Sequence, residues 1–189
     1  MVSLEDWLRE EDAQTLQERV DRAEKLLKLF PDTETGILFF GGTESYRAFV
    51  EAKLAYINGL YLSAILTALA TIERHFAGVF YASGLDSAKR MSFENLLKRG
   101  QKTGLFSDDH AEDFEKFRLI RNSYAHFREP LHELSSIKRM MQEEAGFETI
   151  LHNDALDALR VMGRYFNEYP YPGVRVSSKE AEVKKSADV

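Results

Sequence analysis

The sequence predicts an all-α protein, a helical bundle preceded by an extra helix and followed by a disordered tail. Apolar residues recur at spacings of three and four along almost the whole chain, which is the pattern of amphipathic helices. No segment shows the alternating pattern of a strand, and no internal repeat is present. The 189 residues, 44% hydrophobic and 30% charged, suit one domain with a sizeable core.

The apolar series place three helices in the first half of the chain, at residues 16–30, 46–57 and 61–80. Pro31 ends the first helix. Residues 36–42 form a short apolar segment whose paired glycines lack the Lys-Ser/Thr of a phosphate loop, so we expect a bend there. The third helix is long and apolar, and the sequence Ala82-Ser83-Gly84 ends it.

Capping residues place the later helices. Ser92 precedes a short helix that Gly100 and Gly104 end. The next helix is capped at 107–109, with Glu112 in position to close a capping box on Asp109, and runs to Pro130. A short helix at 137–146 and a final helix capped by Asn153 and ended by Tyr-Pro-Tyr-Pro complete the bundle. The domain plan is therefore residues 1–43 for the extra helix and apolar turn, 44–172 for the bundle, and 173–189 for the tail.

Composition limits the chemistry and the compartment. The chain contains no cysteine, which excludes a disulfide scaffold, a cysteine nucleophile and thiolate metal sites. Residues 1–11 are acidic and lack the apolar core of a signal peptide, and the longest apolar stretch, 60–80, is interrupted by charged residues. We therefore expect a cytoplasmic protein with no membrane segment. The four histidines other than His126 match no metal-ligand spacing, so neither a metal nor a cofactor is expected.

Charge is unevenly distributed along the chain. The net charge of −6 argues against a surface built for long nucleic-acid contacts, although it leaves room for a local basic cleft. Acidic residues crowd the N-terminal region between Glu5 and Asp12, whereas Lys and Arg gather between Lys89 and Lys102. That basic cluster either steers RNA toward a cleft or is a plain solvated surface.

The segment 114–126 is the most informative stretch. On a helix, Phe114, Phe117, Tyr124 and Phe127 form a core stripe, with Arg121 at its edge. On the neighbouring face, polar side chains four residues apart stack on one another, namely Arg118, Asn122 and His126. A guanidinium, an amide and an imidazole are therefore expected to converge within a turn and a half.

Such a set suits phosphodiester chemistry. RNA is cut when a base takes the ribose 2′-OH proton, an acid protonates the leaving oxygen and positive charge stabilises the crowded phosphate. Histidine suits the proton transfers because its unperturbed pKa is about 6.5. Arginine suits the phosphate because its fork stays charged and donates two hydrogen bonds at once. One helix supplies one histidine, so a second copy from a symmetric partner is a natural way to complete the site.

The segment Arg121-Asn122-(Ser123-Tyr124-Ala125)-His126 resembles the signature of the HEPN superfamily, an arginine, a polar residue and then a histidine a few positions on. The layout is similar too, with a long apolar helix carrying Glu73-Arg74 first, a short helical connector next, and the motif near the end of a later helix. The resemblance covers roughly residues 44–168. It implies a helical bundle that dimerises with both motifs facing a shared cleft. It also implies a metal-independent ribonuclease of toxin–antitoxin, abortive-infection or other defence systems, with Arg121 and His126 as the catalytic pair and Asn122 as support.

Each of these residues has a structural alternative. His126 is either catalytic or a helix-end histidine near the last carbonyls. Arg121 is either catalytic or a buried-edge arginine paired with Glu73, whose carboxylate lies on a mainly apolar face and needs a partner. Arg118 either binds phosphate or is solvated, and Tyr124 belongs to the core with a hydroxyl that reaches the site.

The rival function is a HEPN module that binds a partner protein, nucleotide or nucleic acid without cutting it. The settings would be a toxin neutralised by an antitoxin, or a subunit of a defence complex. The amphipathic first helix and the acidic start lie outside the motif region and fit a partner or dimer surface. A plain helical protein carrying a chance motif is the third interpretation.

Overall fold

The computed structural model describes residues 3–30 and 37–169, and this part of the chain is all-α. These residues contain no strand. In chain order, their helices are α1 (Leu4–Leu29), α2 (Gly42–Ile57), α3 (Tyr61–Ala82), a short 3₁₀ helix η1 (Asp86–Arg90), α4 (Phe93–Thr103), α5 (Asp108–Ala125), α6 (Ser136–Glu143) and α7 (Phe147–Glu168). None of these helices combines the length and apolar character needed to cross a membrane. Pro31 and the predicted tail at 173–189 lie outside the described residues.

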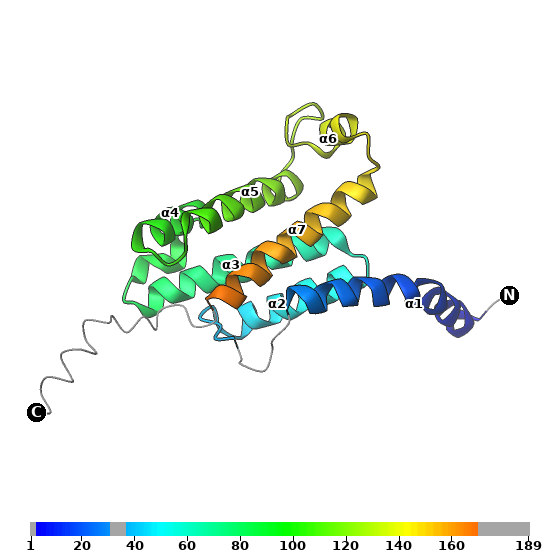
Figure 1. Ribbon diagram of the computed structural model, residues 1–189, viewed down its shortest axis with the longest axis horizontal. Coiled ribbons are helices and arrows are strands. Elements are labelled where there is room, and N and C mark those ends of the chain that lie inside the picture. Colours follow the sequence, from blue (N-terminus) through cyan, green and yellow to red (C-terminus); the bar gives the residue numbers. More distant parts are fainter. Residues whose placement is uncertain (1–2, 31–36, 170–189) are drawn as a thin grey trace, which may run out of the picture.

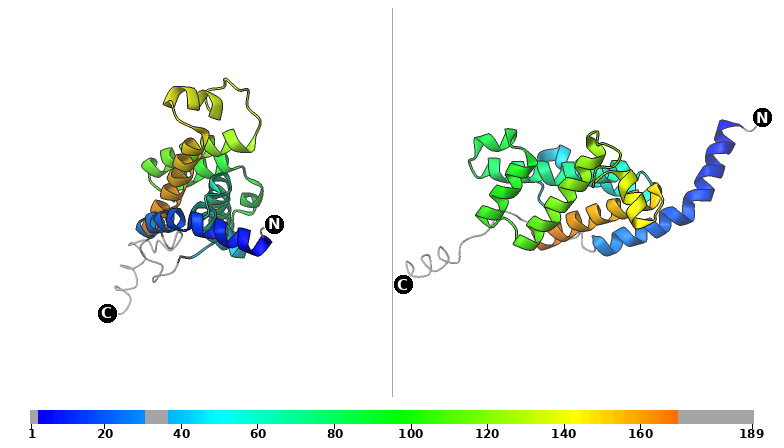
Figure 2. Two further views of the ribbon diagram at one scale, coloured as in Figure 1. Left: turned by 90° about the vertical axis from the view of Figure 1, so that its right-hand side faces the viewer. Right: turned by 90° about the horizontal axis from the view of Figure 1, so that it is seen from above.

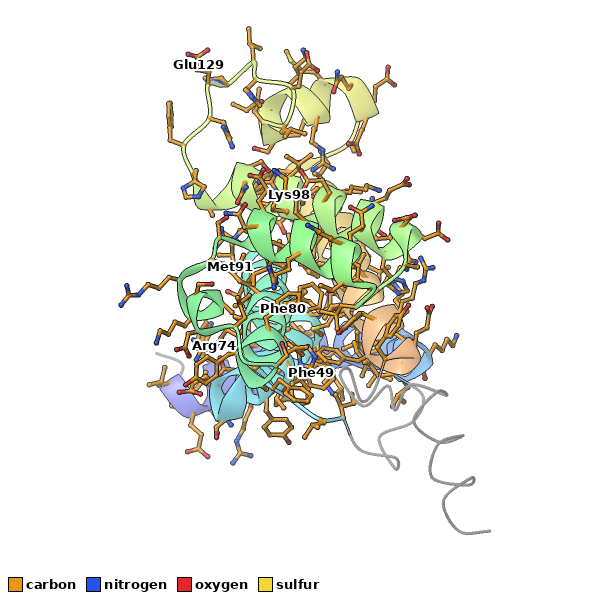
Figure 3. The ribbon with its side chains drawn as sticks, turned by 90° about the vertical axis from the view of Figure 1, so that its left-hand side faces the viewer. Phe49, Arg74, Phe80, Met91, Lys98 and Glu129 are labelled. Carbon is orange, nitrogen blue, oxygen red and sulfur yellow. The ribbon has the colours of Figure 1, made fainter. Side chains whose placement is uncertain are left out.

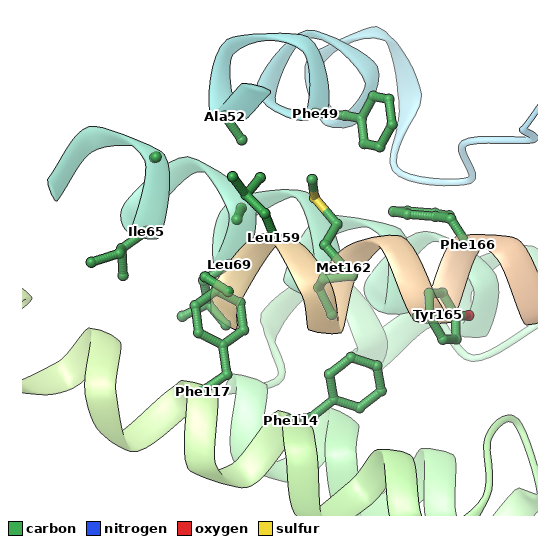
Figure 4. Packing of buried hydrophobic residues seen from close by; sticks show 14 of the residues in the cluster. Phe49, Ala52, Ile65, Leu69, Phe114, Phe117, Leu159, Met162, Tyr165 and Phe166 are labelled. Atoms are coloured by element: carbon green, nitrogen blue, oxygen red, sulfur yellow. The ribbon is translucent and has the colours of Figure 1, made fainter. Parts of the chain in front are cut away.

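Helices α3 and α7 pack against each other in the bundle, and each of them also contacts α2 and α5 (Figure 1). Leu159, Met162 and Phe166 of α7 are completely buried between these neighbours (Figure 4). Next to them, Phe76 of α3 contacts Phe114 of α5, with ring centroids 5.1 Å apart. Burial of such large side chains is the main favourable term for the fold.

Helix α1 begins at Leu4, twelve residues before the predicted start. Ser3 caps it by accepting a hydrogen bond from the backbone N–H of Asp6 at 3.0 Å, and an ion pair between Arg9 and Glu5 lies in its first turns. These local contacts support the first turns, whose large apolar side chains are exposed rather than packed on the bundle. The first half of α1 projects from the bundle, as the view from above shows (Figure 2).

The face of α1 that packs on the bundle is only partly the predicted one. Arg22 and Leu26 are buried, as is Phe30 of the predicted apolar stripe, whereas Leu16, Val20 and Leu27 of that stripe are 57%, 41% and 70% exposed. Arg22 anchors the helix by donating from Nε to the carbonyl oxygen of Ile57 at 2.8 Å. An apolar stripe on α1 is thus left facing away from the bundle.

The bend expected at the paired glycines is present and brings the preceding segment against α3. Gly42 has a φ of 77°, which glycine adopts without strain. The backbone approaches so closely that a Cβ on Gly78 of α3 would lie 2.1 Å from the carbonyl oxygen of Phe40. The pair Gly41 and Gly78 therefore lets the 40–41 backbone lie directly on α3.

One predicted helix start is wrong, and one predicted capping box is not formed. Ser107, within the predicted cap at 107–109, is the N-cap of α5, and its Oγ accepts from the backbone N–H of His110 at 3.4 Å, so the cap is not the predicted box on Asp109. Helix α7 starts at Phe147, and Asn153 lies inside it. The N-cap of α7 is Gly146, which has no side chain to accept a hydrogen bond, so the sequence contains no polar signal for this start.

Candidate functional site

The motif lies at the C-terminal end of α5, where the helix stops earlier than predicted. The last helical residue is Ala125, and His126 has an extended backbone, with φ −128° and ψ 143°. The N–H of His126 still donates to the carbonyl oxygen of Asn122 at 3.2 Å. Pro130 disfavours helix at the residue before it and removes a donor, so the chain leaves the helix a turn ahead of the proline. As a result Phe127, predicted to be core, is 90% exposed.

A pocket of about 260 Å³ opens beside the motif, between α3, α4 and α5. We call it the Arg121 pocket, and its lining residues are Leu69, Glu73, Ser92, Phe93, Glu94, Arg118, Arg121 and Asn122. Four of the six predicted site residues, Glu73, Arg118, Arg121 and Asn122, therefore meet in one place. The other two do not line it. His126 is exposed beyond the helix end, and Tyr124 points elsewhere.

Arg121 is the unsatisfied cation of this pocket. Its Nη1 donates to Oδ1 of Asn122 at 3.2 Å, and its Nε is buried without a hydrogen-bond partner. Among the described residues, no carboxylate lies within 4.0 Å of its guanidinium, so the predicted ion pair with Glu73 is not formed. A buried donor without an acceptor costs free energy, and such exceptions call for an explanation.

Arg118 is held by its own helix instead. Its Nε donates to Oε2 of Glu115 at 2.8 Å and its Nη2 donates to Oε1 at 2.6 Å. The hydrogen bonds that Arg118 donates to Glu115 raise the pKa of Arg118, although its burial opposes this shift. Its charge is thus partly neutralised before any ligand arrives. With Glu73 and Glu94 also on the lining, Arg121 is the main attraction for an anion.

Tyr124 turns away from the pocket and joins a network on the other side of α5. Its hydroxyl donates to Oδ2 of Asp154, a buried residue of α7, at 2.7 Å. Arg139 of α6 donates to both oxygens of the same carboxylate, at 2.6 and 2.9 Å. Burial and the hydrogen bond to Asp154 raise the pKa of Tyr124. This network ties the end of α5 to α6 and α7.

Sequence reasoning missed Asp154 and Arg139, although a signal for the former exists. Asp154 lies between Leu151 and Ala155 on the apolar face of α7, where a carboxylate needs a partner. The prediction of Asn153 as the helix cap hides this signal, because it places Asp154 in the first turn of a helix, where acidic residues are common and need no buried partner. Arg139 has no comparable signal, because it lies on a short helix with no buried residue.

The remaining histidines have structural surroundings. His75 is completely buried among Phe39, Phe166 and Tyr165, neither ring nitrogen has a partner, and burial lowers its pKa to about 3. His110 is also buried, with Nδ1 2.8 Å from Oγ of Ser107. Across residues 3–30 and 37–169, no three His, Asp or Glu residues are grouped as metal ligands.

Two larger cavities exist in the described part of the chain. One, of about 450 Å³, lies between α1, α5 and α7, and its arginines are already paired, Arg160 with Asp157 and Arg164 with Asp113. The other, of about 520 Å³, runs along α3 and shares Glu73 with the Arg121 pocket. Cavity volume alone does not decide which of these spaces is the candidate site. The Arg121 pocket is the candidate site because it holds an unpaired guanidinium and most of the predicted residues.

Comparison of the chain with protein-family models, with curated proteins and with solved structures gave no match. Any functional assignment therefore depends on the residues themselves. One chain offers a pocket lined by Arg121 and, on the extended segment that follows α5, an exposed imidazole that does not line that pocket.

Proposed function

We propose that this protein is a HEPN-type endoribonuclease that binds the scissile phosphodiester of RNA in the Arg121 pocket. The observation that carries the proposal is that Arg121 lines a pocket with a guanidinium that no carboxylate among the described residues pairs, with Nη1 bound to Asn122 and Nε buried without a partner. A phosphate in the pocket would neutralise this cation, and the planar guanidinium suits a phosphate. The motif Arg121-Asn122 followed by His126, and its place at the end of a helix, support the same assignment.

The reaction needs no group beyond the chain and its RNA. An imidazole of His126 takes the proton of the 2′-OH, and the 2′ oxygen attacks the adjacent phosphorus. Arg121 stabilises the charge of the pentacoordinate phosphate, and Asn122 keeps the guanidinium in place through its 3.2 Å hydrogen bond. The bond from phosphorus to the 5′ oxygen breaks as an acid protonates that oxygen. The products are a 2′,3′-cyclic phosphate and a 5′-hydroxyl.

A second copy of the chain completes the site in this proposal. His126 does not line the pocket of its own Arg121, and one histidine per chain supplies either the base or the acid. A two-fold dimer would place two motifs across one cleft. Mixing equal amounts of wild-type and His126→Ala protein should then halve the rate that the wild-type chains give alone, since only about a quarter of the dimers keep both histidines. An unchanged rate, with subunit exchange verified, would contradict the shared site.

The proposal is tested by incubating purified wild-type, His126→Ala and His132→Ala proteins with total RNA and transfer RNA in EDTA. His132 is the matched control, an exposed histidine six residues further along the same segment. We expect cleavage with cyclic-phosphate ends by the wild type and the control, and a large loss for His126→Ala. Cleavage that stops in EDTA, or that survives in His126→Ala, would contradict the mechanism.

A second candidate is a HEPN module that binds a protein partner without cutting RNA, as a toxin does with its antitoxin or a subunit does in a defence complex. Two observations favour it. Glu73 and Glu94 line the Arg121 pocket and oppose a polyanion, and the apolar stripe of α1 is exposed at Leu16, Val20 and Leu27. Absence of cleavage by the wild type, with or without Mg²⁺, would favour this candidate over the ribonuclease.

A further inference from the structure

A second hollow continues from the Arg121 pocket along α3. It encloses about 520 Å³, and Glu73 lines both spaces, so the two adjoin. One side is the 40–41 backbone lying on α3, and the other is η1 with Met91 after it. Arg74 and Met91 lie on the same side of the molecule (Figure 3). We call this hollow the Tyr81 groove.

The groove carries an exposed aromatic ring next to cations. Tyr81, on the last turn of α3, is 54% exposed, and Nζ of Lys89 lies 6.0 Å from the centroid of its ring. Arg74, which also lines the groove, is half-exposed, and its Nη2 lies 3.6 Å from Oε2 of Glu44 in a loose ion pair. Lys89 has no ion pair among the described residues. A lone exposed tyrosine is ordinary, but here it adjoins the motif pocket.

The spacing sets what the groove can hold. Tyr81 follows Glu73 by eight residues on α3, which corresponds to about 12 Å along the helix. That separation is too long for one nucleotide to fill both spaces, so Tyr81 would meet a neighbour of the nucleotide bound by Arg121. Single-stranded nucleic acid is held by aromatic rings on which bases stack and by cations along its backbone. The Tyr81 groove has both components, the ring of Tyr81 and the cation of Lys89.

We propose that the Tyr81 groove binds a nucleotide of single-stranded RNA that flanks the scissile phosphate. Its base stacks on Tyr81 and its phosphate contacts Lys89. The inference rests on the proposed function, because it takes the Arg121 pocket as the place of the scissile phosphate. It gives the basic residue Lys89 a specific role in place of general steering of RNA.

The test is binding of a fluorescent single-stranded 2′-O-methyl RNA, which has no free 2′-OH, measured by anisotropy with the full chain. Tyr81→Ala should weaken binding about tenfold, the usual effect of losing one stacked base. Tyr81→Phe keeps the ring and should bind within about twofold of the wild type. Tyr46→Ala is the control, because Tyr46 of α2 is 53% exposed and does not line the groove.

Salt dependence tests the contact of Lys89 separately. One lost phosphate contact lowers the slope of log K against log salt by about 0.7 for a single strand. Lys89→Gln should therefore lower the slope by about this amount, whereas Tyr81→Ala should leave it unchanged. Wild-type affinity in Tyr81→Ala, or no binding of this RNA by the wild type, would overturn the groove proposal.

The two proposals fail in different ways. If Tyr81→Ala binds like the wild type while unmodified RNA is still cut in EDTA, the groove is wrong and the ribonuclease stands. If the Tyr81 effect is present and no RNA is cut, the groove stands as a binding site and the ribonuclease is wrong.

Discussion

The two polar regions on either side of the end of α5 differ in how their arginines are satisfied. Arg139 donates two hydrogen bonds to the buried Asp154, which also accepts from Tyr124. Arg121 has one hydrogen bond, to Asn122, and a buried Nε without an acceptor. A closed network of this kind holds three helices together. A buried donor without an acceptor costs stability, so Arg121 lacks the compensation that Arg139 has, and our proposal assigns its guanidinium to a ligand.

Replacement of Arg121 should have the largest effect, and on activity rather than on folding. We expect Arg121→Ala to lower the rate of RNA cleavage by a factor on the order of 10² to 10³, as loss of a donor to the transition state does. Its free energy of unfolding in urea should stay within about 1 kcal/mol of the wild type, because no ion pair is broken. Arg118→Ala is the control in the same pocket and should lose at most about tenfold, since Glu115 already engages that guanidinium. Unfolding of Arg121→Ala would instead mark Arg121 as structural.

Breaking the closed network should mainly affect stability. Asp154→Asn leaves the guanidinium of Arg139 without its buried partner and should lower the free energy of unfolding by about 3 kcal/mol. Asp157→Asn is the matched control on the same helix, because its ion pair with Arg160 is exposed and should change stability by less than about 1 kcal/mol. Urea denaturation followed by circular dichroism measures both. Equal effects for the two variants would contradict the contrast.

His75 sharpens the comparison, because it is unsatisfied in a closed core where no ligand reaches it. Its pKa of about 3 in the folded protein lies below the unperturbed value of 6.5, which applies to the unfolded chain. The unfolded state therefore binds the extra proton, and stability should fall as the pH drops below 6.5 and continue to fall until about 3. The loss from this residue between pH 7 and pH 5 is roughly 2 kcal/mol. His75→Leu should remove that part of the pH dependence in urea unfolding at the two pH values, and an unchanged slope would contradict the assignment.

The smallest effect is expected for Tyr124→Phe. The variant removes one hydrogen bond to Asp154 and leaves both bonds from Arg139 in place. We expect a loss of about 1 kcal/mol in the free energy of unfolding, with cleavage close to the wild-type rate. A loss of cleavage as large as that of Arg121→Ala would show that Tyr124 belongs to the site after all.

The sequence predicted most of the helices, because periodicity and serine caps are local signals. The helices at 42–57 and 61–82 and the Ser92 cap agree with the prediction. The start of α1 was missed although Leu4, Trp7 and Leu8 have helical spacing; these side chains are exposed, and a serine cap and an ion pair support the first turns. The start of α7 was missed because a glycine without a side-chain cap precedes it.

For the candidate site, the spacing on α5 correctly grouped Arg118, Arg121 and Asn122, and helix packing brought Glu73 to them. Two details depended on tertiary structure and were not predictable from spacing. The helix ends before His126, and Tyr124 finds its partner on α7, thirty residues later in the chain. A hydrogen-bond partner so distant in sequence leaves no periodic signal.

The most direct measurement follows the Nε–H of Arg121 by nuclear magnetic resonance during titration with a short 2′-O-methyl RNA. The signal is assigned by its loss in Arg121→Lys, and that of Arg139 serves as the internal reference. The account predicts a saturable shift for Arg121, as a phosphate binds its guanidinium, and little change for Arg139, whose Nε already donates to Oε1 of Glu143 and whose two Nη atoms donate to Asp154. An Arg121 signal that stays unchanged at saturating RNA would contradict the assignment of this pocket as the phosphodiester site.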